Sequence, residues 1–269
     1  MGADIKSLRN RIKSVKSTLH LTKAMGLVAS SKIRRAQEAR IKSSQYAKAL
    51  GSIVDVLASS SQCAKSPYLT PVCQENREKL IVIAGDRGLA GGYNVNVFRT
   101  VRELGINNIY PIGKKACDKY SAPHVSSEHF SYEDSYKLAK ELCEQFEQGE
   151  FSRIGIVSTR YVSMITQEPY VKWILPLFNG SGEKNEAEAI FEPGEKAVLE
   201  SAVPMYVAGL IYEATRQSFA CEVVARRSAM DSAGKNATAM IDSLQLEYNR
   251  ARQGAITQEI TEIVAGSGE

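Results

Sequence analysis

Residues 5–57 read IKSLRNRIKSVKSTLHLTKAMGLVASSKIRRAQEARIKSSQYAKALGSIVDVL. Apolar or small residues recur in this stretch about every 3.5 residues, the spacing of a coiled-coil seam. The seam runs through Ile5, Leu8, Ile12, Val15, Leu19, Thr22, Gly26, Ala29, Ile33, Ala36, then Arg40 and Ser43, then Ala47, Leu50, Val54 and Leu57. No proline interrupts it, so a helix of about 50 residues and roughly 75 Å is predicted. Such a helix needs a partner, because its apolar stripe cannot be buried alone.

A second long helix is expected at the other end of the chain. Pro204 is placed in its first turn, where proline is tolerated, and no further proline occurs between Met205 and Val264. Its seam is assigned to Ala237, Ile241, Leu244, Tyr248, Ala251 and Ala255, with a small-residue seam at Ala214, Cys221, Val224 and Ser228 upstream. The ends of a compact segment between the two helices must lie close together, so the simplest pairing of the helices is antiparallel.

The middle of the chain has the pattern of an α/β domain. An apolar β-branched run at 80–84 leads into a glycine turn at 85–94 and then a helix at 95–104. Further strands are expected at Ile109–Ile112, Ile154–Thr159 and Val171–Leu177, and helices at Lys114–Tyr120 and Tyr132–Glu147. Alternating strands and helices predict a Rossmann-like domain with a small, mostly parallel sheet and helical crossovers. Pro176 marks the last strand as an edge or a strand end.

Three domains follow from these patterns. They are an N-terminal coiled-coil helix at 1–58, a central Rossmann-like αβ domain at 59–194 and a C-terminal coiled-coil helix at 195–269. A serine-rich loop containing proline at 59–71 and a polar, glycine-rich segment at Asn179–Asn185 lie within the central domain. The central domain is expected to form a head on a stalk made by the two helices.

Composition and charge narrow the class of protein. The 269 residues are 43% hydrophobic and 24% charged, as in folded proteins, and we expect no membrane span, no signal peptide and an intracellular location. Five cysteines without a C-x-x-C pair predict free thiols, with Cys63 and Cys73 the only pair considered for oxidation. The first helix is strongly basic, which indicates an acidic partner: nucleic acid, an anionic membrane surface or an acidic protein.

No motif in the chain supports catalysis. The glycines of the turn at 85–92 fit neither G-x-G-x-x-G nor a P-loop, so we interpret the segment as a structural turn in which Asp86 and Arg87 pair locally or cap a helix. His124, Glu128 and His129 have no metal-ligand spacing. The aromatic group Tyr161, Tyr170 and Trp173 is interpreted as sheet packing rather than a ligand cage. No activated nucleophile is visible. We therefore assign no catalytic residue, cofactor-binding residue, metal ligand or cofactor.

Three segments resemble one family, the γ subunit of the F-type ATP synthase. Near the C-terminus the resemblance is carried by YNRARQGAITQEITEIV at 248–264, and near the N-terminus by RIKSV at 11–15, LTKAM at 21–25 and VASSK at 28–32. The central landmark is DRGLAGGYN at 86–94, although Gly85 and Ala90 stand where serine and cysteine are more usual in the family. The resemblance extends over essentially the whole chain.

The resemblance implies a non-catalytic rotor, or central-stalk, subunit that couples ion translocation to ATP synthesis or hydrolysis. Its partners would be the α and β subunits of the catalytic hexamer, the ε subunit and the c-subunit ring, with no nucleic acid and no small-molecule substrate of its own. It would be peripheral, on the cytoplasmic face of a bacterial membrane or the matrix side of the mitochondrial inner membrane. The implied rotor–stator coupling contacts are Lys23, Met25, Arg252, Gln253, Thr257 and Glu259.

Four further residues near the C-terminus form an expected apolar tip: Ile256, Ile260, Ile263 and Val264. They fall beyond the expected reach of the first helix, so a surrounding protein sleeve could contact them. Judged from the residues alone, other functions stay open. These are a nucleotide-dependent enzyme built on the central unit, and a coiled-coil adaptor or nucleic-acid-binding protein with a non-catalytic αβ domain.

Overall fold

The computed structural model describes residues 2–70, 73, 75, 77–164, 166–177 and 191–266, with only the backbone at 2–4. The segment Asn179–Asn185 lies outside these residues. Backbone contacts divide the chain into two units, Met1–Ser30 with Arg226–Glu269, and Ser31–Ala225. Two helices run through both units: α1 (Gly2–Ala58, 57 residues) and α5 (Glu195–Gly266, 72 residues). The expectation of a long helix at each end of the chain is confirmed.

The first unit is an antiparallel two-helix coil. A Cβ atom on Gly26 of α1 would lie 3.7 Å from Cβ of Met230, while one on Gly234 of α5 would lie 3.8 Å from Leu19 and Thr22. Residue numbers therefore rise along one helix as they fall along the other. On α1 the predicted seam is buried or half-buried throughout this unit from Ile5 to Ala29.

The seam on α5 follows the predicted positions from Ala237 onward. Ala237, Ile241 and Leu244 are buried, and Tyr248, Ala251 and Ala255 are half-buried. The upstream assignment of Ser228 is wrong, because this residue is exposed. A heptad counted back from Ala237 reaches Met230, which is 6% exposed, so the seam of this unit is out of phase with the small residues assigned upstream.

The second unit contains a four-stranded sheet in the order β2-β1-β3-β4. Its strands are β1 (Glu78–Ile83), β2 (Ile109–Ile112), β3 (Arg153–Tyr161) and β4 (Gln167–Leu175). β1 pairs in parallel with β2 and β3, which confirms the mostly parallel sheet, and β4 is an edge strand that stops before Pro176. β4 pairs antiparallel with β3, so the expected crossover is absent there. The link between these strands is too short to hold a crossover helix.

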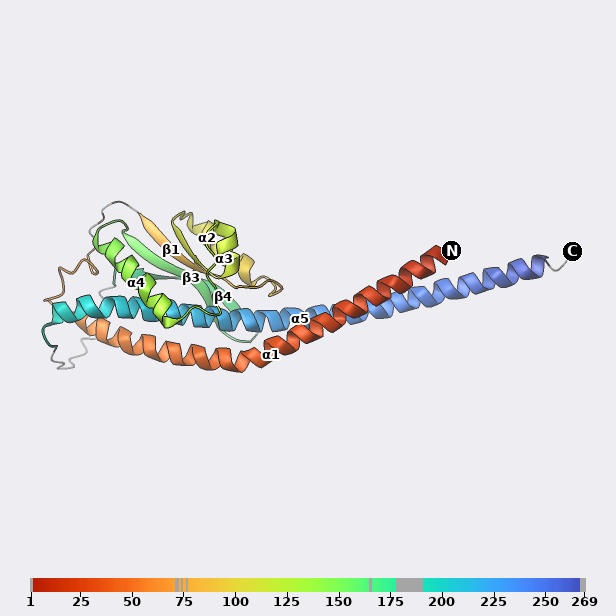
Figure 1. Ribbon diagram of the computed structural model, residues 1–269, viewed down its shortest axis with the longest axis horizontal. Helices are drawn as coiled ribbons and strands as arrows, with labels where there is room; N and C mark the ends of the chain where they lie inside the picture. The colour runs from red at the N-terminus through yellow and green to blue at the C-terminus, as the bar shows by residue number, and fades with distance from the viewer. Residues whose placement is uncertain are drawn as a thin grey trace. The chain divides into compact units, whose positions relative to one another are not determined.

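Helices cover both faces of this sheet (Figure 1). Leu80 and Val82 of β1 pack with α2 (Tyr93–Leu104), whereas Ile81 and Ile83 pack with α4 (Tyr132–Glu147) and α5. The alternation arises because successive residues of a strand point to opposite faces. α3 (Lys114–Tyr120) follows β2, and α4 begins with a capping box made by Ser131 and Asp134.

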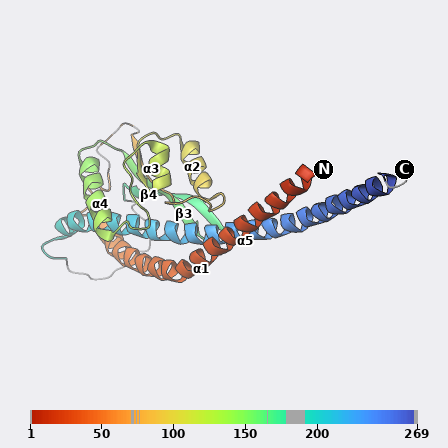
Figure 2. The same cartoon turned by 45° about the vertical axis from the view of Figure 1, so that its right-hand side comes forward.

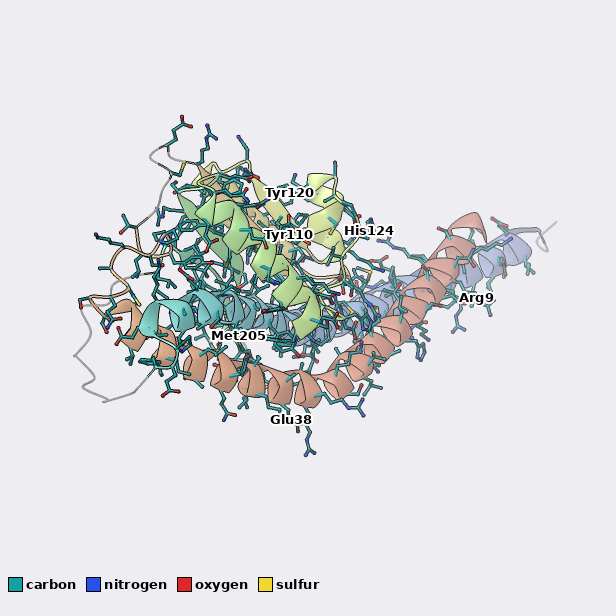
Figure 3. The ribbon with its side chains drawn as sticks, turned by 60° about the vertical axis from the view of Figure 1, so that its left-hand side comes forward. Arg9, Glu38, Tyr110, Tyr120, His124 and Met205 are labelled. Carbon is teal, nitrogen blue, oxygen red and sulfur yellow. The ribbon has the colours of Figure 1, made fainter. Side chains whose placement is uncertain are left out.

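Within the second unit α1 and α5 lie side by side in both ribbon views (Figure 2). A Cβ on Gly51 would lie 3.4 Å from Tyr206, and one on Gly209 would lie 3.5 Å from Tyr46 and Leu50, so the pairing is antiparallel here too. Glu38 projects from α1 away from α5 (Figure 3). It pairs with Arg34, one turn earlier, at 3.0 Å.

The placement of Pro204 in the first turn of the last helix is wrong. α5 begins at Glu195, so Pro204 lies inside the helix and one backbone hydrogen bond is lost there. Leu199, Val203 and Val207, on the same stretch, are all 0% exposed. The burial of this face against the core compensates for the lost bond, and propensity alone could not reveal it. Among the described residues, no helix combines the length and the apolar character needed to cross a bilayer.

Candidate functional site

The predicted contact residues of α1 lie on the surface of the coil. Lys23 is exposed and Met25 is half-buried. On a helix with 3.6 residues per turn, they flank the seam stripe of Thr22 and Gly26 on opposite sides. A groove of about 470 Å³ passes Lys23 and is lined on α5 by Met230, Asp231, Gly234, Lys235, Thr238, Ala239 and Asp242. Lys235 and Asp231 form an ion pair at 2.8 Å on this groove. This groove of the coil therefore carries positively charged Lys23 and Lys235 and negatively charged Asp231 next to Met230.

The predicted contact residues of α5 all lie near its end. Arg252, Gln253, Thr257 and Glu259 are exposed. The hydroxyl of Thr257 donates to the carbonyl of Gln253 at 2.9 Å, so it is held along its own helix. The structure brings this set together within two turns, whereas Lys23 and Met25 form a separate group on α1.

The register of the coil shows where α1 ends relative to α5. Residue numbers add to 256 for Gly26 with Met230 and for Thr22 with Gly234, and to 253 for Leu19 with Gly234. Because both helices rise equally per residue, this register brings Gly2, the first residue of α1, opposite residues 251–254 of α5. α5 continues to Gly266. Beyond Gly254 the four tip residues Ile256, Ile260, Ile263 and Val264 are 45%, 56%, 70% and 64% exposed.

In the second unit, Asp86 joins the end of β1 to the loop that precedes α4. Its carboxylate accepts hydrogen bonds from the backbone N–H groups of Lys114 (3.0 Å), Ser127 (2.9 Å) and Glu128 (3.0 Å). The hydroxyl of Ser126 donates to the same carboxylate at 2.6 Å. Burial alone would raise the pKa of Asp86, but these four hydrogen bonds outweigh it and lower the pKa below its ordinary value.

The same loop is held by both long helices. Arg216 of α5 donates to the backbone carbonyls of Ser127 (2.8 Å), Phe130 (3.0 Å) and Glu128 (3.2 Å). The carboxylate of Glu128 forms an ion pair with Lys32 of α1 and lies 3.8 Å from the guanidinium of Arg87. This charged junction, made by Lys32, Asp86, Arg87, Glu128 and Arg216, fixes the loop to β1, α1 and α5. Of these residues, the sequence predicts a local pairing or capping role for Asp86 and Arg87 alone, because no local spacing relates Lys32, Glu128 and Arg216.

The departure from the seam at Arg40 and Ser43 also has a structural reason. The guanidinium of Arg40 lies 5.1 Å from the ring centroid of Tyr161, at the end of β3. The hydroxyl of Ser43 donates to the carbonyl of Arg40 at 3.0 Å, and Ser43 is 4% exposed. At this point α1 therefore faces the end of β3 as well as α5. The guanidinium of Arg40, which packs on the Tyr161 ring, and the small buried Ser43 stand where the seam would otherwise have apolar residues.

His124 and His129 line one pocket of about 430 Å³ together with Asp134, yet within the described part of the chain no three His, Cys, Asp or Glu side chains are placed to hold a metal ion. His124 pairs with Asp118 at 3.1 Å, while Glu128 is engaged by the junction. Trp173 stacks on Arg153 at 3.8 Å, and the hydroxyl of Tyr170 donates to Gln217 at 3.3 Å. All five cysteines carry free thiols, and burial raises the pKa of Cys143 and Cys221 to about 12, which keeps them protonated.

Fold and surface together define a class of protein: an antiparallel coiled coil whose two helices continue into a small αβ unit. Comparisons with known proteins match nearly the whole chain to one family. A family model described as ATP synthase matches residues 4–268. The protein is 40% identical to the ATP synthase gamma chain of Ruminococcus albus and 38% identical to that of Desulforamulus reducens, each over 98% of both chains. A mitochondrial ATP synthase chain of Euglena gracilis, from an OSCP/F1/c-ring structure, has the same fold with a TM-score of 0.70 at 18% identity, over 99% of this chain and 94% of that one.

The chain belongs to the ATP synthase gamma chain family. It is therefore a central-stalk subunit of an F-type ATP synthase. The sequence-based expectation of this family is confirmed, and the adaptor or nucleic-acid-binding alternative is not favoured.

Proposed function

We propose that this chain is the rotating shaft that couples ion translocation to ATP synthesis or hydrolysis. The observation that carries the proposal is the end of α5, which continues past the end of α1 and presents four exposed apolar residues. Such a single helix with apolar side chains on its surface fits a protein sleeve that surrounds it. The paired helices that precede it supply stiffness, because two packed helices resist bending more than one.

The shaft would contact the catalytic β subunits through two groups of residues. Lys23 and Met25 form the α1 group, and Arg252, Gln253, Thr257 and Glu259 form the α5 group. The exposed ammonium group of Lys23 suits an acidic loop on its partner. None of these residues acts on ATP directly. They would alter the free energy of each β site through contacts that differ with the angle of the shaft.

The energetics are consistent with coupling by contact. Moving one charge across the membrane potential supplies about 2.3 kcal/mol per 100 mV. Rotation would use this free energy to open a β site that holds product ATP tightly. In the reverse direction, ATP hydrolysis would turn the shaft and move ions outward.

Three further assignments belong to this proposal. The central αβ domain at 59–194 would bind the ε subunit and the c-subunit ring, while the helices at 1–58 and 195–269 would form the shaft inside the ring of α and β subunits. The complex would place the chain at the cytoplasmic face of a bacterial membrane, as the bacterial relatives support. The matrix side of the mitochondrial inner membrane is the alternative location.

The direct test is co-purification. The full-length chain with an affinity tag is expressed in cells lacking the native subunit, and membranes are solubilised and purified through the tag. We expect α and β subunits in the eluate, together with ATP hydrolysis. Recovery of the tagged chain without an α/β assembly would contradict the proposal.

A further inference from the structure

Glu222 of α5 is a carboxylic acid in the core of the second unit. Its side chain is 2% exposed, and no other acidic residue in the described part of the chain is buried to this degree. It lies beneath the glycine turn at 85–92, next to Cys221, which packs with Ala90 and Tyr93. Burying a carboxylate is costly unless hydrogen bonds or charges compensate, so its position requires an explanation.

The turn is shaped around this carboxylate. A Cβ on Gly85 would lie 2.7 Å from the Cδ atom of Glu222 and 3.0 Å from each of its carboxylate oxygens. The backbone N–H of Arg87 donates to Oε1 of Glu222 at 3.4 Å. Gly85 therefore leaves the space into which the carboxylate fits, and the chain after it turns an N–H toward the carboxylate.

A second contact fixes the same part of α5, one turn earlier. The hydroxyl of Tyr93, the first residue of α2, donates to the backbone carbonyl of Ser218 at 2.9 Å. Tyr93 is buried, and burial together with the negative charge of Glu222 raises the pKa of its hydroxyl. The glycine turn and the first residue of α2 thus contact α5 at two positions, Glu222 and Ser218, that are four residues apart.

We infer that Glu222 is the internal anionic ligand of the glycine turn and positions α5 against the end of β1. A glycine turn between a buried strand and a helix presents backbone N–H groups that favour anions. In this chain α5 supplies that anion as a side chain. The carboxylate of Glu222 occupies the place beneath the turn where an anion would bind, and its charge would repel a phosphate group. The turn therefore binds a side chain of α5 instead of a nucleotide.

The inference does not depend on rotation, and its test uses the full-length chain alone. Glu222→Ala removes the carboxylate and leaves a space beside Gly85. We expect the melting temperature to fall by at least about 4 °C. Formate should recover at least half of the loss, while chloride at equal ionic strength should not. Wild-type protein should show no difference between the two salts.

Variants that retain a side chain at residue 222 test the same contact if Glu222→Ala does not fold. Glu222→Gln preserves the shape but not the charge, and it should also be less stable than wild type. Gly85→Ala should destabilise the wild-type chain, because its Cβ meets the carboxylate, and should cost less when combined with Glu222→Asp, whose carboxylate is drawn back. Equal effects of formate and chloride, full stability of Glu222→Gln, or the same cost of Gly85→Ala in both backgrounds would overturn the inference.

Discussion

The guanidinium of Arg216 donates a hydrogen bond of 2.8 Å to the backbone carbonyl of Ser127, which links α5 to the loop before α4. The same guanidinium reaches the carbonyls of Glu128 and Phe130. The sheet itself packs against α5 through apolar side chains. Such packing is non-directional, so it restrains the orientation of α5 relative to the sheet only weakly. The charged junction supplies that restraint, because hydrogen bonds and ion pairs have defined geometry.

Arg216→Lys should destabilise the second unit. A lysine keeps the charge but cannot reach three carbonyls with a planar fork of donors, so buried carbonyls would be left without a partner. We expect a loss of about 2 to 3 kcal/mol of unfolding free energy by urea denaturation. The matched control is Arg34→Lys, since Arg34 is exposed and pairs with Glu38 one turn along its own helix. Equal stability of the two variants would argue against the role of Arg216.

Asp86→Asn should lower stability in a manner that depends on pH. Four hydrogen bonds lower the pKa of this carboxyl in the folded chain, so its contribution is present above the ordinary pKa of 3.8 and is lost as the pH falls through the lower folded value. At pH 7 the variant should therefore be less stable than wild type by about 2 kcal/mol. The two melting temperatures should converge as the pH falls below 3.8 and through the lowered pKa of the folded chain.

Convergence of the two melting temperatures at low pH would show that the loss of stability comes from the missing negative charge at residue 86 and not from a change in the shape of the side chain. The amide side chain of the Asp86→Asn variant would retain one oxygen acceptor but could not accept all four hydrogen bonds, and it carries no charge at any pH. A melting-temperature difference that stays constant from pH 7 to pH 3 would show that the lowered pKa contributes nothing. The isolated full-length chain is sufficient for this measurement.

The fold could be predicted because its determinants are periodic and local. A seam from Ile5 to Leu57 defines α1, and short β-branched runs define the strands. The position of Pro204 inside α5 could not be predicted from propensity, because packing of Leu199 and Val203 outweighs the cost of a proline there. The charged junction was missed for a different reason. Lys32 precedes Glu128 by 96 residues and Glu128 precedes Arg216 by 88, and only the fold brings them together.

Met25→Lys should impair coupling in the assembled complex. Met25 is half-buried beside the seam, and an added charge at a close rotor contact would have to be desolvated or displaced. We expect lower ATP-driven ion pumping per ATP hydrolysed in membrane vesicles. Met240→Lys is the control, because Met240 is 46% exposed on α5 and lies outside the predicted contacts. Unchanged pumping by Met25→Lys would remove Met25 from the contact set.

Gly254→Ala should stabilise the end of the coil without changing any contact. Apart from its own helix backbone and chain neighbours, no atom of the described residues lies within 4 Å of a Cβ built on Gly254, and the residue is helical. Alanine is favoured over glycine in a helix by about 1 kcal/mol. Hydrogen exchange of the surrounding α5 amides should slow about fivefold as a result. A faster exchange, or a loss of assembly, would show that the flexibility of glycine is needed at this position.

Truncation after Gln253 should separate the stability of the chain from the stability of the complex. The register brings Gly2 opposite residues 251–254, so the deletion removes the part of α5 beyond the end of α1 and, with it, the half-buried Ala255 at the end of the predicted seam. The melting temperature of the isolated chain should therefore change little. Burial of an isoleucine side chain contributes about 1.5 to 3 kcal/mol, and three isoleucines are lost from the tip, so assembly yield and torque should both fall. Replacing Ile256, Ile260 and Ile263 by serine in the full-length chain should reproduce the assembly defect while keeping the helix length. If truncated and intact chains assemble equally and generate equal torque, the exposed tip is not a bearing surface.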